Sequence, residues 1–141
     1  MDDPIELQRF VAAQDDGGTY EAALRELRAG AKRGHWMWFV FPQVAGLGRS
    51  ATAQRYAVSG LAEARAYLAH PVLGPRLLQA ARVLTGLDGT SAVAVFGSVD
   101  AQKLRSSMTL FARAVPDEPV FREVLDQWFG GAEDEGTTSR L

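Results

Sequence analysis

The stretch that decides the fold is His35-Trp36-Met37-Trp38-Phe39-Val40-Phe41-Pro42-Gln43. Residues 35–41 are all aromatic or apolar, and two of the chain's three tryptophans lie among them. Each aromatic side chain buried there removes about 150–250 Å² of surface from water, so the rest of the chain must pack around this segment. Whether it forms a strand or a helical turn, the segment is apolar on every side, which predicts burial in both cases.

Length and composition limit the class of protein. The chain has 141 residues, enough for one domain with its own core. A net charge of −2 and a pI near 5.7 argue against general nucleic-acid binding. The chain has no cysteine, two histidines, no apolar run long enough to span a membrane and no hydrophobic signal region after Met1. We therefore expect a soluble, cytoplasmic domain without membrane contact, metal or cofactor.

Periodic apolar residues predict helices on both sides of the aromatic segment. The expected helices run from Asp3-Pro4 to about residue 14, from Thr19 to Gly30, from Ser50 to about Val58, from Ser59 to His70-Pro71, from about Pro75 to near Gly86, from Ser98 and Asp100 to Pro116, and from Asp117 and Pro119 through Trp128. The best-defined of these helices, from Ser98 and Asp100 to Pro116, has an apolar stripe of Leu104, Met108, Phe111 and Val115 at spacings of four, three and four. Residues 92–96 fit a short strand or one helical turn equally well. The predicted fold is mainly α, a single compact domain of six or seven helices with at most a minor β element.

The C-terminal residues have a different composition. From Gly130 onward the residues are mostly small, acidic or polar, with Leu141 as the one large apolar residue. Such a segment has little apolar surface to bury, so it predicts disorder. The expected division is a helical domain over residues 1–130 and a disordered tail over residues 131–141.

A glycine-containing turn, Gly46-Leu47-Gly48-Arg49-Ser50, follows the aromatic segment. Its glycines let a ligand approach the backbone, and a helix beginning at Ser50 would offer unpaired N–H groups and the positive end of its dipole. The Arg49 guanidinium can bind a phosphate or carboxylate through two hydrogen bonds. The turn is neither a Walker loop nor a dinucleotide fingerprint. It predicts an anion site, and an ordinary capped turn with a solvated arginine is the alternative.

Polar side chains elsewhere are candidates for the same pocket, whose floor would be the aromatic segment. They are Gln43, Gln54 and Tyr56 near the turn, and Lys103, Ser106 and Ser107 on a later helix. Lys103 and Ser107 are four residues apart and therefore share a helix face. The alternatives are an ordinary exposed face for the first group and hydrogen bonding of the serines to the preceding helical turn for the second. His35 is a further candidate, because burial beside the tryptophans would lower its pKa and keep the imidazole neutral; a purely structural histidine is the alternative.

Motifs spread over residues 7 to about 129 carry a family resemblance. They are Leu7-Gln8-Arg9-Phe10, Tyr20 with Ala23-Leu24, Lys32 through His35-Trp36-Met37-Trp38-Phe39 to Phe41-Pro42-Gln43, Gly46-Leu47-Gly48, Ser50, Tyr56-Ala57, Leu68, His70-Pro71 with Leu73-Gly74, Phe96-Gly97, and Lys103-Leu104-Arg105-Ser106-Ser107-Met108-Thr109-Leu110-Phe111. On these residues the chain resembles an uncharacterised, mainly bacterial family catalogued as domain of unknown function 1810. The resemblance implies a mainly helical fold and no established activity. The layout is also similar, as an analogy, to that of YbiA-like N-glycosidases acting on ribosylated or ADP-ribosylated substrates.

These observations predict a small-molecule pocket for a nucleotide- or ribose-phosphate-like anionic ligand. The analogy implies hydrolysis of an N-glycosidic or ADP-ribosyl bond if the chain is an enzyme, which the residues alone leave open. The alternative is a non-catalytic protein-interaction module whose exposed aromatic residues dock a partner. Catalytic residues are unassigned, and the expected ligand-binding residues are His35, Trp36, Trp38, Gln43, Gly46, Gly48, Arg49, Ser50, Gln54, Tyr56, Lys103, Ser106 and Ser107.

Overall fold

The aromatic segment forms one short helix, α3 (Met37–Val40), packed between α1 (Pro4–Asp15) and α7 (Ala92–Ala114). The computed structural model describes residues 4–89 and 91–141 of the chain. Trp36, Met37, Val40 and Phe41 are buried, whereas Trp38 and Phe39 are partly exposed. The segment is therefore part of the core, as predicted, with one tryptophan inside and the next at the surface.

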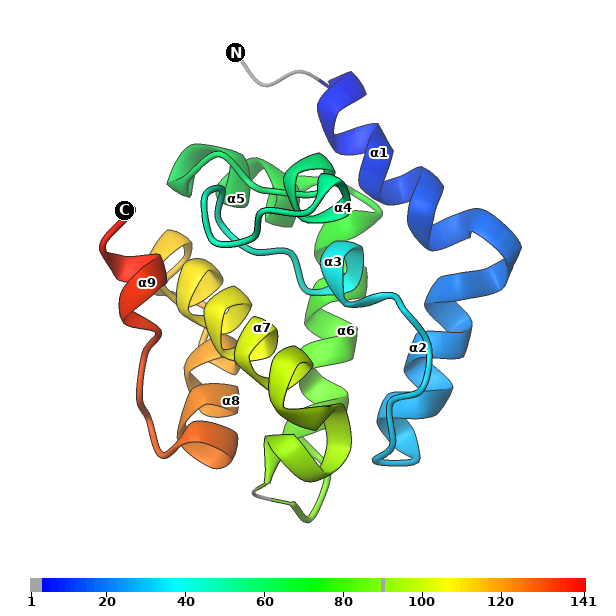
Figure 1. The fold of residues 1–141 in the computed structure, drawn as a ribbon, viewed down its shortest axis with the longest axis vertical. Helices are drawn as coiled ribbons and strands as arrows, with labels where there is room; N and C mark the ends of the chain where they lie inside the picture. Colours follow the sequence, from blue (N-terminus) through cyan, green and yellow to red (C-terminus); the bar gives the residue numbers. More distant parts are fainter. Residues whose placement is uncertain (1–3, 90) are drawn as a thin grey trace.

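The rest of the domain is also mainly helical. The remaining elements are η1 (Asp16–Gly18), α2 (Thr19–Arg28), α4 (Ala51–Arg55), α5 (Leu61–Ala69), α6 (Leu73–Thr85), α8 (Val120–Phe129) and α9 (Glu135–Thr138). In Figure 1, α1 and α2 lie on one side of α6 and α7, and α8 and α9 lie on the other. The mainly α prediction is confirmed: in the described ranges six helices have nine or more residues, and β structure is limited to one isolated parallel bridge, Val44 to Val58.

The core is centred on α7, which packs against α3, α5, α8 and α9. Leu104, Met108 and Phe111 form the predicted apolar stripe of this helix and are completely buried. The Phe111 ring lies 5.5 Å from that of Tyr67 on α5 and 5.6 Å from that of Phe121 on α8, within the range of favourable aromatic pairs. The best-defined periodicity in the sequence therefore marks the centre of the fold.

A buried polar network fixes the position of α3. The Gln14 amide on α1 donates to the Phe39 carbonyl oxygen at 2.8 Å and to the Tyr67 hydroxyl at 3.1 Å. Arg76 on α6 donates to the Gln14 side-chain oxygen at 3.2 Å. Burial raises the pKa of Tyr67 far above its ordinary value, so this hydroxyl keeps its proton as a donor. The network ties three long helices to the segment that carries Trp38.

Residues 92–96, for which strand and helix were both open, are helical and form the first turn of α7. A kink at Gly97, with φ of +80°, separates this turn from the rest of the helix, which explains why the periodicity indicated a start near Ser98. The helix expected to reach Val58 ends at Arg55, because Val58 is buried in the bridge to Val44. The expected Asp3 cap of α1 lies outside the described residues.

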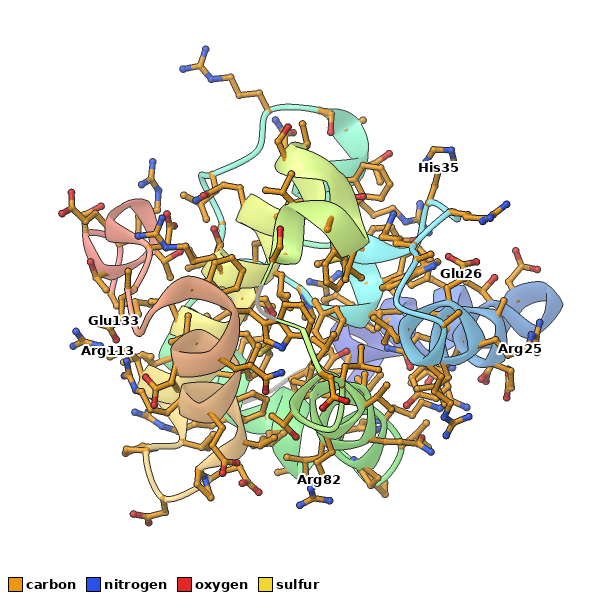
Figure 2. All side chains as sticks on the ribbon, turned by 90° about the horizontal axis from the view of Figure 1, so that it is seen from below. Arg25, Glu26, His35, Arg82, Arg113 and Glu133 are labelled. Atoms are coloured by element: carbon orange, nitrogen blue, oxygen red, sulfur yellow. The ribbon has the colours of Figure 1, made fainter. Side chains whose placement is uncertain are left out.

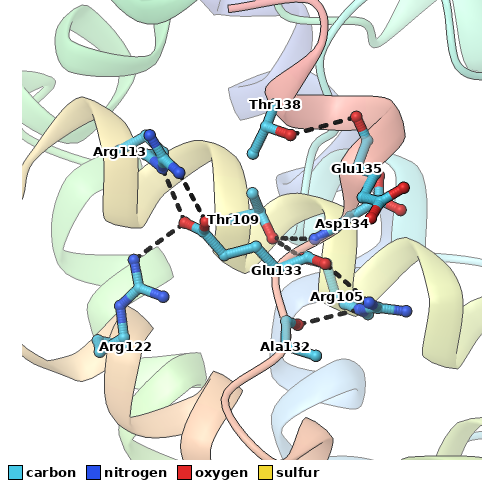
Figure 3. Close-up of polar contacts among 9 residues, drawn as sticks. All are labelled: Arg105, Thr109, Arg113, Arg122, Ala132, Glu133, Asp134, Glu135 and Thr138. Atoms are coloured by element: carbon cyan, nitrogen blue, oxygen red, sulfur yellow. Dashed lines mark hydrogen bonds and ion pairs between the residues drawn. The ribbon is translucent and has the colours of Figure 1, made fainter.

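The predicted disordered tail is wrong. Residues 132–141 form an ordered C-terminal segment that contains α9 and packs against α7. The Arg105 guanidinium donates to the carbonyl oxygens of Ala132 and Glu133 at 3.0 and 2.7 Å, and the Asp134 N–H donates to the Thr109 hydroxyl at 3.0 Å (Figure 3). Hydrogen bonds rather than apolar burial hold this segment, which is why its composition suggested disorder. None of the described helices combines the length and hydropathy required to cross a bilayer.

Candidate functional site

A groove of about 500 Å³ lies between the chain that follows α3 and the α7 helix. Its walls come from three parts of the sequence: Gln43, Leu47 and Gly48; Ser98, Val99, Gln102, Lys103 and Ser106; and Asp134 and Gly136. The C-terminal segment, which the composition had assigned to disorder, therefore supplies one wall. We call this space the large cavity.

A second cavity, of about 120 Å³, adjoins the first. We call it the small cavity; it is lined by Trp38, Gln43, Val44, Ala45, Gly46, Gly48, Ala53, Gln54, Tyr56 and Ala57. Gln43 and Gly48 line both cavities. Trp38, Gln54 and Tyr56 thus line one cavity, which shares Gln43 and Gly48 with the cavity lined by Lys103 and Ser106.

The loop that separates the two cavities is closed at its base. The Val58 N–H donates to the Gln43 carbonyl oxygen at 2.8 Å, and the Ala45 N–H donates to the Val58 carbonyl oxygen at 2.8 Å. These bonds fix the backbone of Gln43 on the core side of the loop. On its outer side, Arg140 donates to the Gly46 carbonyl oxygen at 3.2 Å, which links the loop to the C-terminal segment.

Lys103 is the cationic group of the large cavity. Its Nζ lies 4.3 Å from the centre of the Trp38 ring and 3.4 Å from Oδ1 of Asp100. Oδ2 of the same carboxylate is 2.6 Å from Nζ of Lys32. Two ammonium groups therefore share one carboxylate, and the shorter contact belongs to Lys32. Among the described residues, Lys103 contacts the Trp38 ring and makes one long ion pair, which leaves it unused donor capacity on the cavity wall.

Gln43 is the uncharged polar group at the junction of the two cavities. Its side chain is half-buried, and within the described residues its amide has no hydrogen-bond partner. A side-chain amide carries two donors and a carbonyl acceptor. The backbone of Gln43 is fixed, so its side chain can present both kinds of group at the boundary between the cavities.

Asp134 is the acidic group of the large cavity and is buried. Its carboxylate accepts from the Gln102 amide at 2.7 Å, the Ser106 hydroxyl at 3.0 Å and the Thr137 hydroxyl and N–H at 2.6 and 3.0 Å. Burial opposes ionisation, but these hydrogen bonds outweigh it and lower the pKa of Asp134. The group is therefore a carboxylate at neutral pH, surrounded by uncharged donors.

Arg49 and Ser50 do not form the predicted anion site. Arg49 is exposed and is absent from the walls of both cavities. The Ser50 hydroxyl accepts from the Ala53 N–H at 3.1 Å and so occupies the start of α4, which is only five residues long. This geometry fits the alternative, an ordinary capped turn with a solvated arginine.

Three further candidates lie outside the cavities. Trp36 is 2% exposed and its indole N–H donates to Glu26 at 2.9 Å, so the floor of the small cavity is Trp38 alone and not both tryptophans. His35 is exposed, so its predicted burial is wrong, and Figure 2 shows it at the outer edge of the molecule. Ser107 is completely buried, and its hydroxyl has no partner among the described residues. Ser107 is not among the residues that line either cavity.

Several cavity residues were missed from the sequence, above all Asp134 and Gln102. The Asp134 side chain caps α9 by accepting from the Thr137 backbone N–H, and Asp is one of the preferred residue types at a helix N-cap. That signal was available but was outweighed by the composition of the surrounding residues. Within the described ranges, no group of three or more His, Asp or Glu side chains is placed to hold a metal ion.

Comparison with known proteins gives the family. A family model described as "Protein of unknown function (DUF1810)" matches residues 4–141. The chain belongs to this family. It is also similar to the crystal structure of the conserved hypothetical protein Rv1873 from Mycobacterium tuberculosis, with 50% sequence identity, a TM-score of 0.93 and coverage of 99% of this chain and 98% of that one. No curated protein matches the sequence.

Proposed function

We propose that this member of the family binds a small anionic molecule of the nucleotide or ribose-phosphate type in the large cavity. The observation that carries the proposal is the position of Lys103, a cation on the cavity wall whose carboxylate partner within the described ranges, Asp100, lies 3.4 Å away. A phosphate oxygen that replaced or joined Asp100 there would gain a charge-assisted hydrogen bond. Lys103, rather than Arg49, is the anion-binding residue of this proposal.

The part of the cavity wall that contains Asp134 suits the uncharged part of such a ligand. The Asp134 carboxylate is an acceptor only, and Oδ1 receives one hydrogen bond, from Gln102, whereas Oδ2 receives three. Oδ1 therefore keeps acceptor capacity for a hydroxyl of a sugar. Leu47 and Val99 add apolar surface to the same cavity. A cation, an acceptor and an apolar edge together match a phosphorylated sugar better than they match a bare inorganic anion.

Calorimetric titration of the full chain with ribose 5-phosphate, AMP and ADP-ribose tests this proposal. The Lys103→Met variant keeps the aliphatic stem over Trp38 but loses the charge, and it should weaken binding by about 1.5–3 kcal/mol. Arg82→Ala is a matched control, because that side chain is 62% exposed and lies on α6, outside both cavities. Equal affinity of the Lys103→Met variant and the unmodified chain, or no binding of any of the three compounds, would overturn the proposal.

Hydrolysis of an N-glycosidic or ADP-ribosyl bond is a second candidate function, favoured by Asp134. A carboxylate kept ionised on a cavity wall is the type of group that stabilises the oxocarbenium-like transition state of glycosidic cleavage. Incubation of the protein with ADP-ribose and with nucleosides, followed by chromatography, would reveal the released base or ribosyl product. Absence of product in the presence of demonstrated binding would leave a binding protein without this activity.

The interaction-module alternative receives less support from the geometry. Within the described residues, the exposed large apolar side chains are Val93, Val99 and Leu141, and none is aromatic. The exposed aromatic docking surface that this hypothesis required is therefore not found there. Trp38 and Tyr56 are partly exposed, but they face the small cavity.

A further inference from the structure

The small cavity is no larger than a single ring. Its volume is about 120 Å³, somewhat below the roughly 150 Å³ of a cavity that binds benzene, so at most one ring can enter it, with one edge in the adjoining large cavity. A fused two-ring system such as a purine exceeds this space. Two aromatic side chains, Trp38 and Tyr56, line the cavity, and aromatic walls favour a planar aromatic guest.

The polar edge of such a guest would meet Gln43. The Gln43 amide has no partner within the described residues, and it lies where the two cavities join. Gln43 is partly buried, and an amide without a protein partner at a cavity wall can pair with a ligand that supplies both an acceptor and a donor. Nitrogen heterocycles with adjacent ring nitrogen and amino or carbonyl groups offer that pair, and side-chain amides commonly read such edges.

The other amide of the small cavity serves as a comparison. Gln54 donates its side-chain N–H to the Arg49 carbonyl oxygen at 3.1 Å and is exposed. It already has a structural partner, whereas Gln43 does not. Of the two amides, Gln43 is therefore the one available to a ligand.

The ring subsite and the anion subsite are adjacent. Trp38 lines the small cavity on one side and carries the Lys103 ammonium over its ring at 4.3 Å. Gln43 and Gly48 belong to both cavities. One molecule can therefore occupy both, with its ring beside Trp38 and Tyr56 and its charged group near Lys103.

We infer that the ligand is a single-ring nitrogen heteroaromatic joined to an anionic group, the chemical class of the pyrimidine nucleotides, and that Gln43 is the residue that reads its ring. This inference rests on the proposed function, because it takes the anion site at Lys103 as given. It adds the class of the uncharged part of the ligand and the residue that selects it.

Calorimetric titration with CMP, UMP, AMP and ribose 5-phosphate tests the inference on the unmodified chain. We expect at least one of the pyrimidine nucleotides to bind about tenfold or more tightly than both AMP and ribose 5-phosphate, because only it fills the ring subsite and pairs with Gln43. If ribose 5-phosphate binds as tightly as both pyrimidine nucleotides, or AMP binds at least as tightly as they do, the inference is overturned while the anion site stands. If none of the four phosphates binds, the inference and the proposed function both fail.

A variant then assigns the selectivity to the amide. Gln43→Leu keeps a side chain of similar size but removes both donor and acceptor. The affinity of this variant for the pyrimidine nucleotides should therefore fall to within about twofold of its affinity for ribose 5-phosphate. Gln8→Leu, on an exposed position of α1 away from both cavities, is the matched control and should keep the full selectivity. Retention of the pyrimidine preference by the Gln43→Leu variant would show that Gln43 does not read the ring. The ligand series on the unmodified chain does not depend on how well this variant folds.

Discussion

Two tryptophans two positions apart have opposite surroundings. Trp36 is 2% exposed, its indole N–H is bonded to Glu26, and Lys32 lies 5.1 Å from its ring with a side chain only 5% exposed. Trp38 is partly exposed, lines the small cavity, and has Lys103 over its ring with a side chain 19% exposed. We call the first group (Trp36, Lys32, Glu26) the closed region and the second (Trp38, Lys103, Gln43) the open region.

One carboxylate links the two regions, because Asp100 binds Lys32 at 2.6 Å and Lys103 at 3.4 Å. The same residue types therefore complete a structural contact on one side and leave an incomplete one on the other. Residue type does not distinguish a scaffold from a site here. The distinction lies in whether the polar groups already have partners.

The largest expected effect separates the two tryptophans by stability. Trp36→Ala should lower the free energy of unfolding by about 3–5 kcal/mol, because it empties a buried site and leaves Glu26 without one of its donors. Trp38→Ala should cost less than about 2 kcal/mol, since part of that ring already faces a cavity. Urea denaturation followed by circular dichroism measures both. Similar losses in the two variants would contradict the division into closed and open regions.

The next effect concerns the C-terminal segment, which forms a wall of the open region only. Truncation after Gly130 removes Asp134, the hydrogen-bond partner of the buried Ser106 and Thr109 hydroxyls. We expect the free energy of unfolding to fall by about 2–4 kcal/mol, with a lower melting temperature. Ser106 loses the Asp134 carboxylate, Thr109 loses the Asp134 N–H, and surface that the segment covers is exposed to water. Differential scanning calorimetry of the truncated chain is the measurement. An unchanged melting temperature would show that the segment adds nothing to stability.

A smaller effect separates the two lysines. Lys32→Met removes the close, nearly buried partner of Asp100 and should destabilise the fold by about 1–3 kcal/mol; Lys103 remains to limit the loss. Lys103→Met removes a long ion pair at a partly exposed position and should cost less than about 1 kcal/mol. Thermal unfolding of both variants, at low and at moderate salt concentration, shows which substitution causes the larger loss of stability. The comparison fails if Lys103→Met is the more destabilising of the two.

The smallest effect is a pH dependence of the free energy of unfolding, caused by Glu133 in the C-terminal segment. Hydrogen bonds from Arg113, together with Arg122, lower the pKa of Glu133 from about 4.5 to about 2 against the opposing effect of burial (Figure 3). A lowered pKa in the folded state means that the ionised carboxylate stabilises the fold above about pH 4.5, and that this contribution disappears as the pH falls towards 2.

The unmodified chain should therefore lose stability relative to Glu133→Gln as the pH falls from 5 to 2, with a constant difference above pH 5. Both arginine side chains are about half exposed, 51% and 45%, so solvent screening keeps the difference small. Urea denaturation of both proteins at each pH is the measurement. A difference that is constant over the whole range would contradict the shifted pKa.

Much of the fold was accessible from the sequence because apolar spacing reports which helix face is buried. Leu104, Met108 and Phe111 are completely buried, as their spacing predicted. The C-terminal segment was missed for a physical reason. It is held by Arg105, Asp134 and Glu133 through hydrogen bonds and ion pairs, and these contacts leave no periodic apolar signal.

The site was predicted in part for a related reason. The sequence pattern marked Trp38, Gln43, Tyr56 and Lys103 as candidates, and the structure places them around two adjoining cavities. The pattern could not show that Glu26 accepts from the Trp36 indole while Lys32 lies over its ring. Nor could it show that the Ser50 hydroxyl caps the helix beside Arg49. Which polar groups remain without partners depends on contacts between distant segments, and a single sequence does not encode those locally.

The pair of backbone hydrogen bonds at Val58 has a consequence for how the protein can change over evolution. Because Ala45 and Gln43 are joined to Val58 at 2.8 Å, the 13 residues from 45 to 57 leave and re-enter the core at one point. Lengthening a loop with fixed ends costs little, about 0.6 kcal/mol for each doubling. Insertions at its exposed positions, residues 49–52, therefore leave the helical core nearly untouched, whereas Tyr56 packs on Phe10 and Phe39 and is tied to the core. If the cavities hold the proposed ligand, its preference can diverge between relatives through this loop without a matching loss of stability.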